Sequence, residues 1–147
     1  MADTQNYSNH TRWYPLFHFV LVPLLALNFF EHAVRIYTNT GAERWEQVFW
    51  TVFSFSLILL ALAARLMALK AQDRVIRLEE RLRYRELLSP ELAARASDLP
   101  VNHIIALRFA SDGELSDLVT QVLDGKLKTS KEIKMAIKDW RADYHRV

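Results

Sequence analysis

A segment of eighteen residues without a single charge, residues 47–64 (QVFWTVFSFSLILLALAA), constrains the fold of this chain more than any other feature. As an α-helix it is about 27 Å long, close to the bilayer hydrocarbon thickness of about 30 Å. A core helix of a soluble protein usually keeps one polar face toward water. The segment is therefore predicted to span a membrane.

A second apolar segment precedes it. Residues 15–30 are interrupted only by His18 and Asn28, and extension to Ile36 gives 22 residues, about 33 Å as a helix. This is long enough for a second span, in which the interior Pro23 is predicted to distort the helix. A signal peptide is the alternative. It is disfavoured because polar and charged residues, not a small-residue cleavage site, follow the apolar segment.

The distribution of basic residues predicts an orientation. Residues 37–46 form a short connection, so the two spans are predicted to form an antiparallel hairpin. Arg44 is the one basic residue of that connection, whereas seven follow the second span: Arg65, Lys70, Arg74, Arg77, Arg81, Arg83 and Arg85. Because positive residues favour the cytoplasmic side, both termini are expected in the cytoplasm.

Composition predicts an all-α protein. The 147 residues include only three glycines and four prolines and no cysteine. Disulfides, thiolate metal sites and cysteine nucleophiles are thereby excluded. The net charge of +2 does not indicate nucleic-acid binding, and no nucleic-acid partner is predicted.

Four regions are predicted along the chain. They are an N-terminal tail (1–12), the hairpin (13–69), a basic juxtamembrane helix (70–88) and a helical domain (89–147). The juxtamembrane helix is expected to continue the second span, with an apolar stripe too irregular for a heptad assignment. Helices are predicted near 90–97, 101–110, 112–124 and 130–143.

Helix-end signals support these boundaries. Ser89 and Pro90 are typical of a helix start, as are Ser111 with Asp112 and the segment 129–132 (TSKE). Gly125 after Asp124 is typical of a helix end. In the last helix, one apolar face is predicted to combine four residues: Ile133, Ala136, Ile137 and Trp140.

The strongest candidate site is a polar face on the first span: Asn28, Glu31, His32 and Arg35. These positions share one helix face, and ionisable groups at membrane depth are costly and often functional. Glu31 and Arg35 are expected to pair. We predict that this face contacts protein; an interfacial or structural role and a proton, metal or haem role are the alternatives.

No residue set indicates an active site. His18 and His32 lie about 21 Å apart on one helix, so a single metal cannot bind both from one chain. The sequence has neither a glycine-rich phosphate loop nor a G-x-S-x-G elbow. We therefore predict no catalytic residues, no cofactor and no enzymatic activity.

The basic helix is a second candidate surface. Five basic residues in this helix or just before it are predicted to contact lipid headgroups or a partner: Arg65, Lys70, Arg74, Arg77 and Arg81. Each basic residue near an anionic membrane contributes about 1 kcal/mol. A solvated helix with internal ion pairs is the alternative.

Three segments resemble a known family: QNYSNHTRWYPLFHF (5–19), ALRFASDGEL (106–115) and EIKMAIKDWRADYHRV (132–147). They are similar to a family of small bacterial membrane proteins of unknown function, with two N-terminal spans and a helical cytoplasmic tail. The resemblance covers nearly the whole chain. It implies a bacterial inner-membrane location and supplies no functional residues.

The sequence therefore predicts a non-enzymatic, two-span membrane protein that interacts with membrane lipids and assembles through its helices as a homo-oligomer or within a larger membrane complex. One alternative is an accessory subunit of a respiratory or other energy-converting complex. Another is an oligomeric channel or a membrane-shaping protein.

Overall fold

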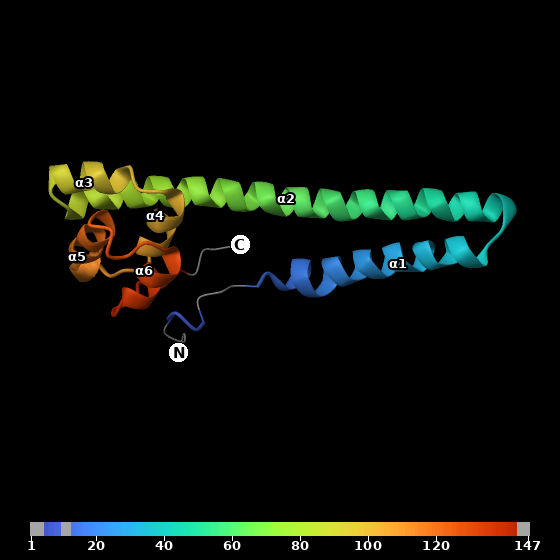
Figure 1. The fold of residues 1–147 in the computed structure, drawn as a ribbon, viewed down its shortest axis with the longest axis horizontal. Coiled ribbons are helices and arrows are strands. Elements are labelled where there is room, and N and C mark those ends of the chain that lie inside the picture. The colour runs from blue at the N-terminus through green and yellow to red at the C-terminus, as the bar shows by residue number, and fades with distance from the viewer. Residues whose placement is uncertain (1–4, 10–12, 144–147) are drawn as a thin grey trace. The chain divides into compact units, whose positions relative to one another are not determined.

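A computed structural model describes residues 5–9 and 13–143, so most of the predicted tail at 1–12 lies outside the described residues. Every regular element in this part of the chain is helical (Figure 1). The described residues form two compact units. The hairpin unit is Trp13–Leu69, and the tail unit comprises residues 70–143 together with 5–9.

The first helical segment of the hairpin unit begins with a π-helix. It comprises η1 (Leu16–Leu21) followed by α1 (Val22–Thr38). Pro23 lies in the first turn of α1, where its missing N–H cannot bond to the preceding turn. The predicted distortion takes the form of a widened turn before the proline, which is a common way for a helix to accommodate an interruption.

The connection is shorter than predicted. Only residues 39–40 lie between the end of α1 and the start of helix α2 (Gly41–Leu87), rather than the predicted 37–46. Gly41 has a φ of +58°, a conformation that glycine adopts without steric cost. Arg44 Nε also donates to the carbonyl oxygen of Asn39 at 3.0 Å. Both features favour a tight turn.

Helix α2 is continuous for 47 residues. Neither glycine nor proline occurs between residues 42 and 89, so nothing in the sequence interrupts the backbone hydrogen bonds. The predicted continuation of the second span into the basic helix is confirmed. It ends at Leu87, one residue before the predicted boundary.

Four short helices follow in the tail unit: α3 (Pro90–Ser97), α4 (Val101–Leu107), α5 (Asp112–Leu123) and α6 (Ser130–Ala136). Ser89 Oγ accepts the backbone N–H of Leu92, which confirms it as the N-cap of α3. Thr129 and Glu132 form a reciprocal capping box at the start of α6.

Two predicted helices are too long. Helix α4 ends at Leu107 rather than 110, and α6 ends at Ala136 rather than 143. Beyond these ends the two segments pair with each other: Ser111 N donates to Asp139 O at 3.0 Å, and Arg141 N donates to Phe109 O at 2.8 Å. These hydrogen bonds between the two segments take the place of the backbone hydrogen bonds that longer α4 and α6 helices would form. Ile137 and Trp140 therefore do not share a helix face with Ile133 and Ala136.

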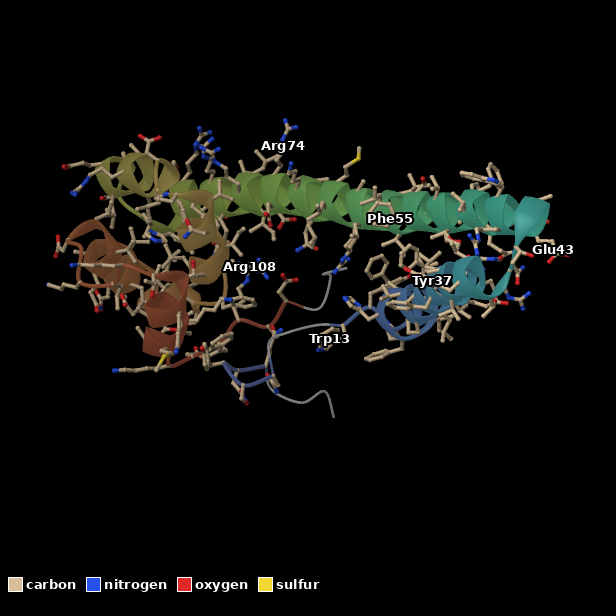
Figure 2. The ribbon with its side chains drawn as sticks, turned by 45° about the vertical axis from the view of Figure 1, so that its right-hand side comes forward. Trp13, Tyr37, Glu43, Phe55, Arg74 and Arg108 are labelled. Carbon is tan, nitrogen blue, oxygen red and sulfur yellow. The ribbon has the colours of Figure 1, made fainter. Side chains whose placement is uncertain are left out.

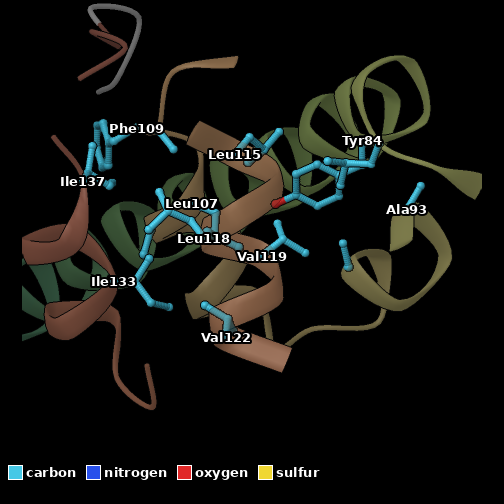
Figure 3. Packing of buried hydrophobic residues seen from close by; sticks show 14 residues of the cluster. Tyr84, Ala93, Leu107, Phe109, Leu115, Leu118, Val119, Val122, Ile133 and Ile137 are labelled. Carbon is cyan, nitrogen blue, oxygen red and sulfur yellow. The ribbon is translucent and has the colours of Figure 1, made fainter. Parts of the chain in front are cut away.

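The tail unit is built around one hydrophobic core, shown in Figure 3. The Tyr84 ring points from α2 toward α5, where Leu115 and Val119 lie. Ile133 and Ile137 are buried in the same core, and the Trp140 ring packs on Phe109 with centroids 5.0 Å apart. The four residues of the predicted face thus lie in or against one core, although Ile137 and Trp140 lie beyond the end of the helix that was predicted to carry them.

Candidate functional site

Two side chains of the predicted polar face join the helices of the hairpin. His32 Nδ1 lies 2.8 Å from Gln47 Oε1, and Ser54 Oγ donates to Asn28 Oδ1. Gln47 and Ser54 are both buried, although they belong to the apolar segment of α2. Each polar group thus meets another polar group between the helices, which avoids the cost of exposing it to an apolar environment.

The other two residues of this face pair with each other. Glu31 Oε1 and Arg35 Nη2 are 2.7 Å apart, which confirms the predicted ion pair. Their side chains are 52% and 55% exposed, so the pair lies at the surface. The predicted face is therefore divided: Asn28 and His32 hold α1 to α2, whereas the ion pair lies on the outer surface.

Aromatic rings pack beside the polar contacts. The His32 and Trp50 rings stack with centroids 6.0 Å apart, and Phe29 lies 6.0 Å from Phe55. Figure 2 labels Phe55 on α2 and Tyr37 near the end of α1. Tyr37 is 87% exposed, so aromatic side chains both fill the hairpin and line its surface.

The outer surface of the hairpin is strongly apolar. The helical segments Leu16–Thr38 and Gly41–Leu87 are each long and apolar enough to cross a membrane. In their most apolar stretches, 0% and 6% of the residues are buried. A core helix of a soluble protein would instead bury such residues. The exposed side chains include Leu16, Phe19, Leu24, Leu27, Phe30, Phe49, Val52, Leu59 and Leu60.

The five basic residues predicted to contact lipid or a partner have different environments. In the hairpin unit, the Arg65 guanidinium lies 5.8 Å from the centre of the Phe17 ring. In the tail unit, Arg81 donates twice to the carbonyl oxygen of Ser97, at 2.8 and 3.2 Å. Lys70 and Arg74 are exposed, and Figure 2 shows Arg74 pointing away from α4, α5 and α6. Arg77 is half-buried.

The sequence did not predict a charge cluster in the tail unit, in which Glu80 and Arg83 are buried and Asp112 and Arg141 are exposed. Arg83 bonds Asp112 Oδ1 at 2.6 Å, the carbonyl oxygen of Ala110 at 2.7 Å and Glu80 Oε2 at 3.2 Å. Arg141 Nη1 is 3.4 Å from Glu80 Oε1. The expected side-chain cap at Ser111 is absent, and Asp112 instead binds Arg83. The cluster ties α2 to the start of α5.

The same cluster lines a hollow of about 410 Å³. Arg108 lies there with its Nε 3.1 Å from Asp143 Oδ2 and its guanidinium 4.3 Å from the centre of the Phe109 ring. Burial raises the pKa of Glu80, and the positive charges of Arg83, Arg141 and Arg108 partly oppose that rise. Carboxylates and guanidinium groups thus pair with one another around the hollow, as buried charges require.

One sequence signal could have identified this cluster. Arg108 interrupts the apolar segment 104–110 (IIALRFA), and a charge within such a segment is usually paired when it is buried. Its partner Asp143 is 35 positions later, so spacing alone does not reveal the pair. The Arg83–Asp112 pair is similarly distant in sequence.

Two further histidines contact backbone carbonyl oxygens. His18 Nδ1 lies 3.0 Å from the carbonyl oxygen of Tyr14, and His103 Nε2 lies 3.1 Å from that of Lys128. Among the residues that the structure describes, no group of three or more His, Asp or Glu side chains is arranged to hold a metal ion.

These features define a class of helical protein in which two long apolar helices are linked to a small helical unit with its own core. The chain belongs to a family of unknown function (DUF6526), which matches residues 1–147. No curated protein and no solved structure is similar to it.

Proposed function

We propose that this chain is a non-enzymatic integral protein of the bacterial inner membrane. Its hairpin is the membrane anchor, and its tail unit is a cytoplasmic assembly module. The protein works as a homo-oligomer or as a structural subunit of a larger membrane complex.

The uncovered apolar surface of the hairpin carries this proposal. Phe19, Leu27 and Phe30 are between 64% and 68% exposed, and Leu60 is 64% exposed on the other helix. Contiguous apolar surface of this extent is costly in water and favourable against lipid tails. Inside the hairpin, the contacts of Asn28 with Ser54 and of His32 with Gln47 satisfy polar groups that lipid cannot hydrogen-bond.

The distribution of basic residues supports the orientation. Arg44 is the one basic residue within ten positions of the turn on the α2 side, whereas seven occur between residues 65 and 85. The positive-inside tendency therefore favours a cytoplasmic tail unit and a turn on the opposite side of the membrane. Arg65 lies at the end of the apolar segment, where its side chain reaches the headgroup region.

The charge cluster supports an assembly role for the tail unit. Arg83 is held by Glu80, Asp112 and a backbone carbonyl, and Arg108 is held by Asp143. Mutually paired charges rigidify a fold, whereas a general acid or base needs a group that can exchange its proton with substrate. The cluster therefore supports the proposed assembly role by making the tail unit rigid.

Membrane fractionation and cysteine labelling test this proposal. The chain has no native cysteine, so Glu43→Cys near the turn and Asp117→Cys on α5 are single labelling sites, and both positions are exposed. We expect the protein to stay in the membrane pellet after alkaline carbonate extraction. In intact cells without their outer membrane, a membrane-impermeant maleimide should label the variant at position 43 and not the one at 117.

Release of the protein by carbonate would contradict membrane integration. Labelling of both variants, or only of the variant at position 117, would contradict the orientation. Permeabilised cells are the control, since both cysteines should then be labelled.

A further inference from the structure

Helix α2 carries two different apolar faces in the tail unit. Ile76, Tyr84 and Leu88 are 8% exposed or less and pack in or beside the core, although Leu88 lies one residue past the helix. Val75, Leu78 and Leu82 are between 52% and 61% exposed. The apolar stripe is irregular in the sequence because residues of both faces alternate along it. The exposed fractions of the side chains in the structure show which residues belong to which face.

The exposed face has the spacing of a coiled-coil seam. Ala71, Val75, Leu78 and Leu82 follow one another at intervals of four, three and four residues. This is the 3-4 alternation of heptad positions a and d, with Val75 at a and Leu78 at d. A β-branched residue at a with leucine at d favours two parallel strands. The same alternation extends backward in the sequence to Ala68 and Ala64.

Charges beside the seam complement those of an identical helix. Arg74 occupies position g and Glu79 the following position e, and both are exposed. In a parallel pair, position g of one helix lies beside position e of the other, so Arg74 of each copy meets Glu79 of its partner copy. Arg81 and Glu86 place the same positive and negative charges at positions g and e one heptad later, although Arg81 also binds the carbonyl oxygen of Ser97.

We propose that this face binds a second copy of the chain, forming a parallel two-stranded coiled coil through Ala71, Val75, Leu78 and Leu82. The inference rests on the proposed membrane location, because two copies inserted in the same orientation bring their α2 helices together in parallel. The seam covers about two heptads, which is short for a free coiled coil. Confinement to one membrane raises the effective concentration of the two helices.

Cysteine crosslinking of the full-length protein in its membrane tests the seam. Leu78→Cys places a thiol at position d. Leu87→Cys is the matched control, since Leu87 is 43% exposed on the same helix but lies at position f, away from the seam. Because a disulfide needs Cα atoms within about 7 Å, we expect oxidation to yield at least about tenfold more dimer from Leu78→Cys than from Leu87→Cys.

A charge reversal tests the parallel register independently. Glu79→Arg places two arginines side by side at both edges of the dimer, and it should weaken dimerisation about threefold to tenfold. Adding Arg74→Glu restores opposite charges, so the double variant should dimerise like the native chain. Single-molecule photobleaching in lipid nanodiscs, with the native chain giving two-step traces, measures the dimer fraction.

Equal crosslinking of the two cysteine variants, or single-step photobleaching of the native chain, would overturn the coiled coil. Crosslinking of Leu78→Cys to a different protein would overturn it as well, by showing another occupant of the face. Carbonate extraction of the same membranes separates the two proposals: a retained but monomeric protein contradicts only the coiled coil, and a released protein contradicts membrane integration.

Discussion

Single polar residues join separate segments in both units. In the hairpin, His32 and Asn28 reach polar partners on α2 and so specify which faces of the two helices meet. In the tail unit, Arg83 of α2 binds Glu80 on its own helix and also binds Asp112 and the carbonyl oxygen of Ala110 at the start of α5. Removing one member of such a buried set costs more than the set contributes as a whole, because it leaves another charge unpaired.

Tyr84 contrasts with these residues. Its side chain is fully buried, and its hydroxyl has no hydrogen-bond partner among the described residues. Burial, together with the nearby negative charge of Glu80, raises the pKa of this hydroxyl above the normal tyrosine value. The ring therefore stabilises the core through apolar contact, whereas burial of its hydroxyl without a hydrogen bond lowers the free energy of unfolding.

Tyr84→Phe should therefore leave the free energy of unfolding unchanged or raise it by up to about 1 kcal/mol. The measurement is urea unfolding of the full-length protein in detergent micelles, followed by tryptophan fluorescence. Leu115→Ala, in the same core, should instead lower that free energy by about 2–5 kcal/mol. A clear loss of stability in Tyr84→Phe would show that the hydroxyl has a partner.

At the scale of elements, helix ends depend on local chemistry where a cap is available and on distant pairing where it is not. Helix α5 ends in a Schellman motif: Lys126 N donates to Gln121 O at 3.0 Å, and Gly125 N donates to Val122 O at 3.1 Å. The sequence predicted this helix end from Gly125, which has a φ of +74°. Helix α6 ends earlier than predicted because Glu114 accepts the N–H groups of Lys138 and Asp139.

Gly125→Ala should destabilise the tail unit by about 1 kcal/mol, since a side chain is strained at positive φ. Gly113→Ala is the matched control: Gly113 lies within α5, its φ is not positive, and nothing surrounds the added methyl within 4 Å. This variant should be neutral or more stable by up to about 1 kcal/mol. Nothing lies within 4 Å of the added methyl group at Gly125 either, so a difference between the two variants in thermal unfolding, monitored by circular dichroism, measures backbone strain. Equal effects would exclude strain.

At the scale of the whole molecule, the chain combines two kinds of stability. The hairpin has little buried apolar surface of its own, and in the proposed membrane its backbone hydrogen bonds are protected by lipid. The tail unit has a hydrophobic core, but it is small and is closed by charge pairs. Continuity of α2 connects these two units covalently.

The full-length protein in micelles should therefore unfold in urea in two steps. The tail unit is expected to unfold first, and the helical signal of the hairpin should persist to higher urea concentration. Far-ultraviolet circular dichroism measures both steps, and Leu115→Ala should shift only the first one. A single cooperative transition would show that the two units stabilise each other.

The sequence by itself determined the all-helical composition, the two apolar segments, the continuity of α2 and the caps at Ser89 and Thr129. Each of these depends on residues within a few positions of one another, so local patterns reveal them. Only the tertiary structure decided where α4 and α6 end, which charges join Arg83 and Arg108, and which apolar residues of α2 face the core. These features depend on contacts between residues tens of positions apart, and burial, not spacing, selects among the alternatives that the local pattern allows.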